Sequence, residues 1–329
     1  MTDRRAVIPV SSEPALHAVD VFELRPRCVV VASACVTIFL LVAPRSVGYA
    51  QESLLDDAPK VVELGEPLEN LFLVDVTTGD RRQLTHDNDR FCGSPAWSPD
   101  GKWIAYDGWR RGQGFSDSLL YVMRADGSER HTIGAGAMPS WSPDGSQLVI
   151  HNYQSPQTIE VLNADGRGRE IIIDHWGSPR WSPDGKWIAS TSRRRGISIF
   201  DLATGQEREI LPAAVSHYIG HSISPDSTRI CFADPDVGLG IAQLFDPPAT
   251  AEVRWLVRSG RGTHSSWSPD GSRIVVSWRY PDRHVNQLYV LDVATDLADG
   301  KRPEPRLLEG QDPNRNNEGP AWSPDGKWI

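Results

Sequence analysis

Four histidines stand at related places in the chain and could together hold a divalent metal. Each lies within six residues before a recurring tryptophan, or before the isoleucine that replaces it once: His175, His217, His221 and His264. Imidazole nitrogens are common ligands of zinc and other transition metals. Because the spacing differs between copies and no carboxylate recurs beside them, we expect loop or capping histidines and keep a metal site as the alternative.

The short motifs that prepare a nucleophile or bind a phosphate do not occur in the chain. A serine nucleophile elbow reads Gly-x-Ser-x-Gly, and the nearest string, Gly220 to Ser224, lacks the second glycine. Cys-x-x-Cys, His-Glu-x-x-His and phosphate-loop patterns are also missing from the sequence. We therefore predict a protein without catalytic activity and without a cofactor.

A second group of residues combines arginine with aromatic side chains, a composition enriched at the energetic centres of protein interfaces. These residues follow the second strand expected in each repeat and comprise Trp109, Arg110, Arg111, Arg193, Arg194, Arg195, Trp278, Arg279 and Tyr280. They differ from repeat to repeat, so folding does not require them, and we predict a binding surface. The formal net charge of −9 argues against a nucleic-acid partner.

Both groups are positioned by a unit that occurs six times. Its first copy runs from Ala96 to Tyr106 and reads AWSPDGKWIAY, and the prolines of successive copies are 44, 40, 42, 44 and 55 residues apart. A period near 40 is typical of β-propeller blades. The recurring tryptophans and aspartates are Trp97, Asp100, Trp141, Asp144, Trp181, Asp184, Asp226, Trp267, Asp270, Trp322 and Asp325.

The chemistry of the unit predicts a blade of four antiparallel strands. Pro-Asp-Gly fixes one φ, offers a carboxylate to the backbone and allows a positive φ, so the chain reverses between a first and a second strand. A third strand, such as Leu120 to Arg124, ends at another turn and is followed by a fourth. We expect the recurring indoles to pack between blades, because they carry a large apolar area.

The Trp-Ser-Pro-Asp-Gly unit resembles the WD40-like repeat of the TolB propeller family, which also occurs in the propellers of prolyl-oligopeptidase-type proteases. The resemblance covers about residues 70–329. It implies an all-β propeller, but it says little about activity, since propellers carry unrelated functions. The enzymatic alternatives are a peptidase propeller whose catalytic domain is missing, and a carbohydrate-active, lyase-like propeller that uses the histidines.

The two ends of the repeat region are complementary. Residues 70–86 read as a third and fourth strand, and residues 319–329 read as a first and second strand. Joined together they would make one blade and close the ring, which would protect the exposed strand edges. We therefore expect a six-bladed propeller over residues 70–329, with the sixth four-stranded blade shared between the chain ends.

An up-down blade separates its connections onto two rims. The turns after the first and third strands form the turn rim, which carries the recurring aspartates and whose acidity we attribute to turn chemistry. The loops after the second and fourth strands form the loop rim, which carries the arginines and aromatics. We predict that this loop rim binds a protein or an anionic cell-envelope polymer.

The N-terminal region predicts export. An arginine-flanked apolar run, residues 28–43, precedes Gly48-Tyr49-Ala50, so residues 1–50 read as a signal peptide or an N-terminal anchor and residues 51–69 as a linker. We expect a periplasmic or secreted protein, with a membrane anchor as the alternative. Of the four cysteines, Cys92 and Cys231 lie in blades too far apart to pair, so we expect both thiols to be free.

Overall fold

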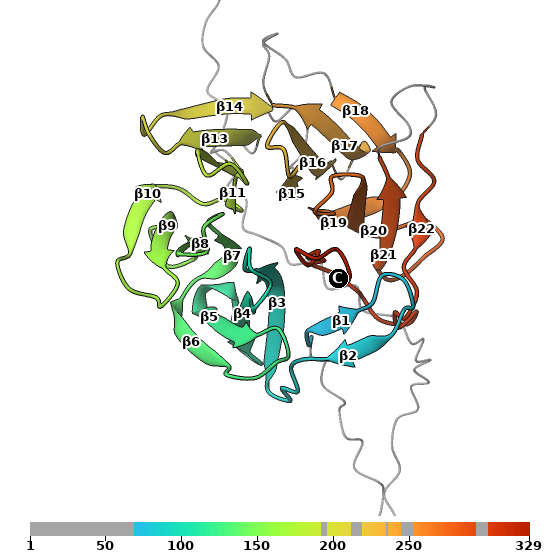
Figure 1. The fold of residues 1–329 in the computed structure, drawn as a ribbon, viewed down its shortest axis with the longest axis horizontal. Coiled ribbons are helices and arrows are strands. Elements are labelled where there is room, and N and C mark those ends of the chain that lie inside the picture. The colour runs from blue at the N-terminus through green and yellow to red at the C-terminus, as the bar shows by residue number, and fades with distance from the viewer. Residues whose placement is uncertain (1–68, 192–195, 212–218, 235, 245–252, 294–301) are drawn as a thin grey trace, which may run out of the picture. The chain divides into compact units, whose positions relative to one another are not determined.

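Each full repeat folds into a four-stranded antiparallel sheet, and the sheets stand around a common axis with their first strands innermost (Figure 1). Blade 1 contains β3 (Arg90–Trp97), β4 (Trp103–Arg110), β5 (Leu119–Arg124) and β6 (His131–Ala135). Blade 2 contains β7 (Ala137–Trp141), β8 (Gln147–Asn152), β9 (Thr158–Asn163) and β10 (Glu170–Ile173). The expected all-β propeller is therefore confirmed.

The other blades follow the same order along the chain. Blade 3 contains β11 (Arg180–Trp181), β12 (Trp187–Thr191), β13 (Ile197–Asp201) and β14 (Glu207–Leu211). Blade 4 contains β15 (Ile219–Ile223), β16 (Arg229–Asp234), β17 (Gly238–Gln243) and β18 (Val253–Val257). Blade 5 contains β19 (Arg261–Trp267), β20 (Arg273–Arg279), β21 (Gln287–Asp292) and β22 (Arg306–Leu307).

This computed structural model describes residues 69–191, 196–211, 219–234, 236–244, 253–293 and 302–329. Arg193, Arg194, Arg195 and His217 lie outside the described residues, as do the expected leader and nearly all of the linker. No helix in the described ranges has the length and hydropathy needed to cross a membrane.

The expectation of six four-stranded blades is wrong, because the described residues form five such sheets. Next to blade 1 lies a two-stranded sheet of β1 (Phe72–Val74) and β2 (Arg81–Gln83). The C-terminal residues reach β1 through a single bridge between Asp75 and Trp328. Reciprocal backbone hydrogen bonds of 2.9 and 3.0 Å between Val74 and Ile329 flank it. One bridge is too short a ladder to make the C-terminal segment a strand of this sheet.

The repeated turn has the same hydrogen bonds in every copy. In the first, Ser98 Oγ donates to Asp100 Oδ1 at 2.7 Å, and the backbone N–H of Lys102 donates to the same oxygen at 3.1 Å. Trp103 N donates to Ser98 Oγ at 2.9 Å, which starts the second strand. These bonds stabilise the ionised carboxylate and lower the pKa of Asp144 and Asp270 to about 2. The aspartates of the turn rim thus serve the turn itself.

The recurring tryptophans join neighbouring blades, as expected. Trp141 Nε1 donates to Ala96 O of the preceding blade at 3.1 Å, and Trp267 Nε1 donates to Ser222 O at 3.3 Å. Trp97 makes the same bond to Ala321 O at 3.2 Å, which ties blade 1 to the C-terminal segment. Apolar side chains of β1 pack both on blade 1 and on blade 5. These contacts close the ring between blades 5 and 1, although the β1–β2 sheet that lies there has only two strands.

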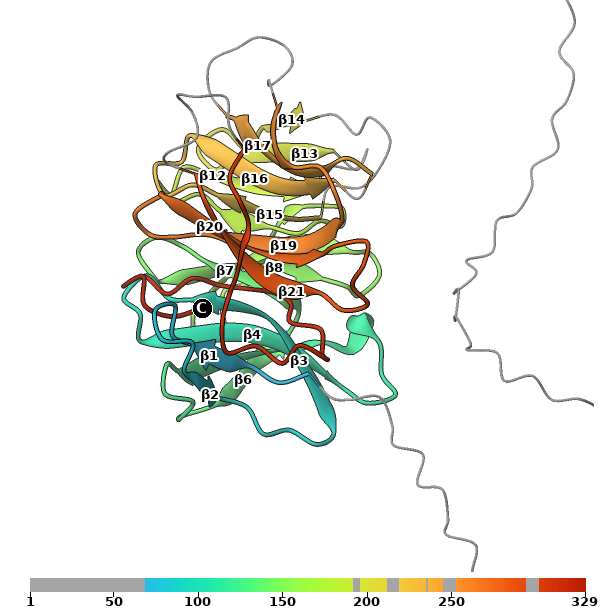
Figure 2. The same ribbon diagram turned by 90° about the vertical axis from the view of Figure 1, so that its right-hand side faces the viewer.

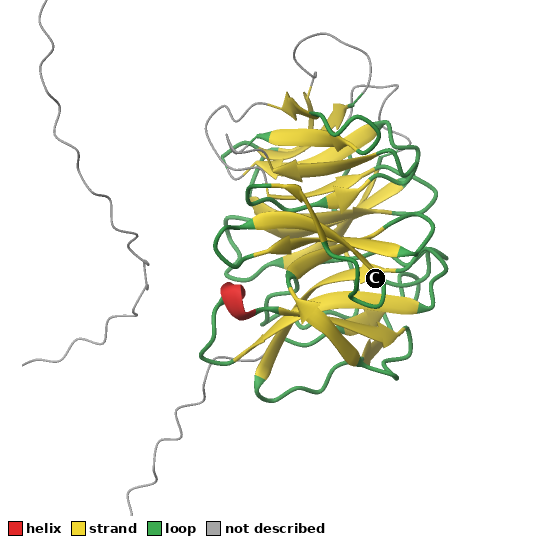
Figure 3. Ribbon diagram, turned by 90° about the vertical axis from the view of Figure 1, so that its left-hand side faces the viewer, coloured by secondary structure: helices red, strands yellow, loops and turns green. Residues whose placement is uncertain are grey.

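The two rims predicted from the repeat are present on opposite ends of the strands. Ala125 N donates to Lys102 O at 2.9 Å, so the turn after the third strand lies beside the Pro-Asp-Gly turn. Arg111 N donates to Asp89 O at 2.8 Å, which places the loop after the second strand beside the start of the first. A single 3-10 turn, η1 (Phe115–Asp117), protrudes from this loop rim (Figure 3). The edge-on view shows the blades stacked behind one another (Figure 2).

Cys92 and Cys231 are both buried and unpaired, as expected. Burial raises the pKa of each thiol to about 12, which keeps it protonated. Cys231 packs in the apolar core between blades 4 and 5. The two thiols therefore behave as small core residues rather than as nucleophiles.

Candidate functional site

The loop rim of blade 5 carries a pocket surrounded by arginines. Arg261 on β19 and Arg279 on β20 are direct cross-strand partners, and both side chains are exposed. With Arg283 they line a pocket of about 370 Å³, whose other walls are Gly260, Tyr280 and Pro281. Like charges placed directly opposite each other destabilise a β-ladder. This arrangement costs stability and offers positive charge to a ligand.

Few anions neutralise this arginine group. Among the described residues, Arg261 and Arg279 make no ion pair within 4.0 Å, and Arg283 meets only its neighbour Asp282, at 3.8 Å. Both members of that pair are well exposed, and such pairs contribute about 0–1 kcal/mol. Tyr280 supplies an aromatic wall, held edge-on against Tyr289 with ring centroids 5.2 Å apart. The pocket can hold a carboxylate, sulfate or phosphate group beside an aromatic ring.

The structure corrects the placement of Trp278, which we expected on the loop rim. Its side chain is only 1 % exposed, and its Nε1 donates to Ser259 O at 2.8 Å. A Cβ on the facing Gly262 would lie 2.2 Å from the indole, so glycine is needed there. Trp278 therefore supports the pocket from below and is not a contact residue.

The loop rim of blade 1 is built from the same residue types but is already paired. Trp109 stacks on Phe91 with centroids 5.4 Å apart and lies 4.5 Å from Phe115. Arg110 Nε meets Asp89 Oδ2 at 3.8 Å, and Arg111 has partners of its own. Phe115 is 54 % exposed, so this rim presents an aromatic surface beside its arginines.

The three described histidines of the group, His175, His221 and His264, do not form a metal-binding arrangement, and two of them lie on strands and not in the loops where we expected them. His175 is buried and its Nε2 lies 3.2 Å from Glu207 Oε2, while His221 and His264 lie on β15 and β19. In the described ranges, no group of three or more His, Cys, Asp or Glu side chains has a metal-binding arrangement. Burial lowers the pKa of His221 to about 3 and that of His264 to about 4, so both imidazoles are neutral at pH 7.

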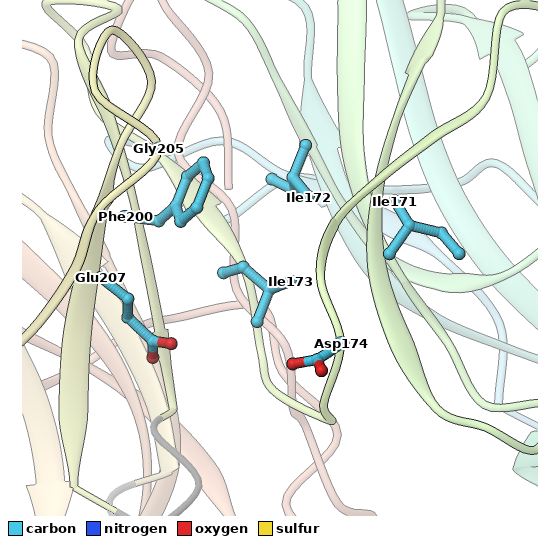
Figure 4. Close-up of a pocket in the computed structure, with 7 residues that line it drawn as sticks. All are labelled: Ile171, Ile172, Ile173, Asp174, Phe200, Gly205 and Glu207. Atoms are coloured by element: carbon cyan, nitrogen blue, oxygen red, sulfur yellow. The ribbon is translucent and has the colours of Figure 1, made fainter.

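Glu207 and Asp174 also border a hollow of about 280 Å³ between blades 2 and 3 (Figure 4). Ile171, Ile172 and Ile173 of β10 form one wall, and Phe200 and Gly205 of blade 3 form the other. The Glu207 carboxylate is held by His175 and by Ser198 Oγ, which donates at 2.5 Å. The hollow therefore combines apolar contact with two carboxylates, Asp174 and Glu207, neither of which is free of interactions.

A polar group that the sequence analysis missed lies on the inner strands. We call Asp107, Arg180, His221 and His264 the inner cluster. Arg180 begins β11, and its positive charge lowers the pKa of both histidines and opposes the burial that raises the pKa of Asp107. Burial in turn lowers the pKa of Arg180. Asp107 Oδ2 accepts a 2.8 Å hydrogen bond from Met138 N on the next blade.

Irregular first strands position two of these residues, His221 on β15 and His264 on β19. The β-ladder is interrupted by bulges at Gly93–Ala96, Ala137–Ser140, Ile219–Ser222 and Gly262–Ser265. A bulge bends its strand and redirects side chains, and such bulges are common beside functional sites. At Gly220, φ is 57° and an added Cβ would lie 1.7 Å from Thr263 O, so only glycine permits the close approach of β15 and β19.

A sequence signal for Arg180 existed in the repeat alignment. The residue before the recurring tryptophan or isoleucine is small in every other copy, namely Ala96, Ser140, Ser222, Ser266 and Ala321. An arginine at this inward position departs from the repeat without any local reason. Asp107 gave no comparable signal, because second strands vary at its position.

Comparison with known proteins agrees with the observed fold. Residues 71–299 match the family described as the TolB beta propeller domain. The chain is 32% identical over 139 residues to the uncharacterized protein Atu1656 of Agrobacterium fabrum, which covers 36% of this chain and 46% of that protein. It is 26% identical over 164 residues to the uncharacterized peptidase YuxL of Bacillus subtilis, covering 36% of this chain and 24% of YuxL.

The crystal structure of TolB from Acinetobacter baumannii is similar in fold. It superposes with a TM-score of 0.63 and 23% sequence identity, over 78% of this chain and 65% of that one. At this identity the similarity concerns the fold alone. The alignments with the two curated relatives above each span less than half of the relative's length.

Proposed function

The chain belongs to the TolB beta propeller domain family, and we propose that it is an exported, non-catalytic binding scaffold. Its loop rim recognises an anionic group carried by a protein or by a cell-envelope polymer. The observation that carries this proposal is the arginine group of blade 5, where Arg261, Arg279 and Arg283 surround one open pocket. A cross-strand arginine pair without a neutralising anion lowers the stability of the folded protein, so we attribute its presence to binding.

The composition of the pocket fits an anchor point in a larger interface. Arginine and tyrosine are enriched among residues that dominate binding energies, and guanidinium groups pair with carboxylates and phosphates through two parallel hydrogen bonds. The aromatic row of blade 1, from Phe91 to Phe115, offers additional contact area on the same rim. Arg193, Arg194 and Arg195 remain predicted contributors from blade 3.

The test is a pulldown from envelope extract with the full chain and two charge-matched variants. The first variant carries Arg261→Ser, Arg279→Ser and Arg283→Ser. The control carries Arg167→Ser, Arg208→Ser and Arg306→Ser, which removes three exposed arginines away from the loop rim. We expect the first variant to lose partners that the control retains, with a loss of at least about tenfold in affinity. Equal partner profiles would contradict the proposal.

Salt distinguishes the two kinds of partner. Exposed charges are screened over about 8 Å at physiological ionic strength, so capture of a polymer held mainly by charge should fall steeply as salt rises. A protein partner buried against Tyr280 should be retained better. Treatment of the extract with a protease before the pulldown gives an independent answer, because only the polymer would survive it.

Export is tested separately from binding. We propose cleavage after Ala50, so N-terminal sequencing of protein from the envelope fraction should begin at Gln51. Sequence from residues upstream of Cys28 would instead support the membrane anchor.

The similarity to YuxL, named as an uncharacterized peptidase, favours a second candidate, the propeller portion of a peptidase. A fluorophosphonate probe labels activated serines, and antibody against the propeller identifies the protein that carries it in envelope extract. We expect no probe-labelled protein to react with this antibody, whereas a labelled protein larger than this chain that reacts with it would favour the peptidase.

A further inference from the structure

The guanidinium of Arg180 forms few hydrogen bonds with the protein itself. Its Nη1 donates to Pro179 O at 2.8 Å, a carbonyl of the adjacent residue. Within the described ranges it makes no ion pair with a carboxylate within 4.0 Å. A guanidinium has five N–H donors, so most of its hydrogen-bonding capacity is left over. Its side chain is half-buried, which leaves access from solvent.

The surroundings of Arg180 disfavour a purely structural role. An arginine that must leave water needs compensating partners, and an uncompensated one costs stability. Every other copy of the repeat folds with alanine or serine at this position, so the ring does not need a cation there. The charge of Arg180 acts to lower the pKa of Asp107, but the two side chains lie beyond ion-pair distance. The Asp107 carboxylate already accepts a hydrogen bond from Met138 N.

His221 and His264 lie on neighbouring first strands, because β15 contacts both β11, which carries Arg180, and β19. They stand on the bulges of β15 and β19, whose backbones touch where Gly220 faces Thr263 and His264. His264 Nδ1 is buried without a hydrogen-bond partner in the described structure. A neutral imidazole can donate one N–H to an anion and adds no charge that would have to be neutralised.

We propose that Arg180, with His264 and His221 beside it, forms an inner site that binds one carboxylate group. The planar fork of the guanidinium matches the two oxygens of a carboxylate. A single guanidinium neutralises a singly charged carboxylate, whereas a doubly charged phosphate would keep one uncompensated negative charge inside the ring. The inner site is separate from the arginine pocket of blade 5, so it does not depend on the proposed function.

Histidine NMR of the full chain provides the test, with sodium acetate as the probe and inorganic phosphate for comparison. An anion on Arg180 changes the electric field at the two imidazoles, so titration with acetate at pH 7, where acetate is ionised and the protein is stable, should shift the ring signals of His221 and His264. Single His221→Asn and His264→Asn variants assign the two signals. Phosphate should bind more weakly than acetate.

The key variant is Arg180→Ser, because blades 2, 4 and 5 carry serine at this position and fold with it. We expect this variant to lose at least about tenfold in acetate affinity. Arg180→Lys, which retains the charge but not the fork, should bind with intermediate affinity. The Arg261→Ser, Arg279→Ser, Arg283→Ser variant should keep the full acetate response, whatever happens to partner capture.

Three results would overturn the inner site. The first is the absence of any acetate-dependent shift in the two wild-type histidines. The second is an equal shift in the wild type and in Arg180→Ser, with the variant's melting temperature unchanged. The third is tighter binding of phosphate than of acetate.

Discussion

Blades 1 and 5 carry the same arginine pair at the loop rim but use it differently. In blade 1, Arg90 lies opposite Arg110; in blade 5, Arg261 lies opposite Arg279. The Arg90 guanidinium lies 5.0 Å from the ring centroid of Tyr121, and Arg110 pairs with Asp89. The blade 5 pair has no such partners among the described residues. The comparison shows that one backbone template can hold the same pair in contact with neighbouring side chains in one blade and leave it without such partners in the described part of the other.

The tryptophans beside the two pairs differ in the same way. Trp109 stacks between Phe91 and Phe115 near the surface, whereas Trp278 is buried beneath the arginine pocket. The reason is the strand opposite. Gly262 leaves the space that the Trp278 ring fills, whereas Phe91 stands opposite Trp109. A glycine in the first strand therefore decides whether the indole enters the core.

The largest expected effect comes from truncating these two indoles. Trp278→Ala should lower the free energy of unfolding by about 3–5 kcal/mol, because it removes a fully buried ring and leaves a cavity. Trp109→Ala should cost clearly less, since its ring is only half-buried. Urea denaturation of both variants checks the difference, and equal losses would remove the contrast between the blades.

Acid should weaken the whole ring without changing that contrast. Burial lowers the pKa of His151 to about 4, of His221 to about 3 and of His264 to about 4. The unfolded chain therefore binds more protons below pH about 6.5, so stability is full above that pH and falls toward pH 4. Arginines do not titrate in this range, and melting temperatures of the wild type and both tryptophan variants should fall in parallel. A flat profile between pH 7 and 4 would contradict the buried neutral histidines.

Partner binding should separate the two arginine pairs. The double variant Arg261→Ser, Arg279→Ser should lose at least about tenfold in affinity for the captured partner. The matching variant Arg90→Ser, Arg110→Ser should bind nearly as the wild type does, because Arg90 packs over the Tyr121 ring and Arg110 lies beside Asp89. Pulldown at low salt compares the two variants directly, and a greater loss in the blade 1 variant would move the binding site to that blade.

The smallest expected effect is on the free energy of unfolding, which should change in opposite directions when the arginine pair of blade 5 or that of blade 1 is removed. Removing the unneutralised pair of blade 5 should leave the free energy of unfolding unchanged or raise it by up to about 1 kcal/mol. Removing the blade 1 pair should lower it by up to about 1–2 kcal/mol, through the lost Arg90–Tyr121 contact and the Arg110–Asp89 pair. Thermal unfolding of both double variants measures the sign, which should be opposite if blade 5 retains its arginines for binding.

The sequence by itself determined the blade. Each Ser-Pro-Asp-Gly turn is held by bonds that span at most five residues, from Ser98 to Trp103 in the first copy, so local chemistry fixes it. The period then predicted the strand order, and the recurring indoles predicted the packing between blades. The two free cysteines also followed, since blades on different sides of a ring cannot pair their thiols.

Tertiary structure alone decided the rest. The number of four-stranded sheets depended on how many backbone groups residues 74–76 and 327–329 could pair, and these form one bridge and three hydrogen bonds. The burial of Trp278 and the grouping of Arg180 with His264, 84 residues later in the chain, depend on bulges and on contacts between separate blades. A shift of one residue in a strand turns its side chains to the other face, and no local pattern in the sequence records such a shift.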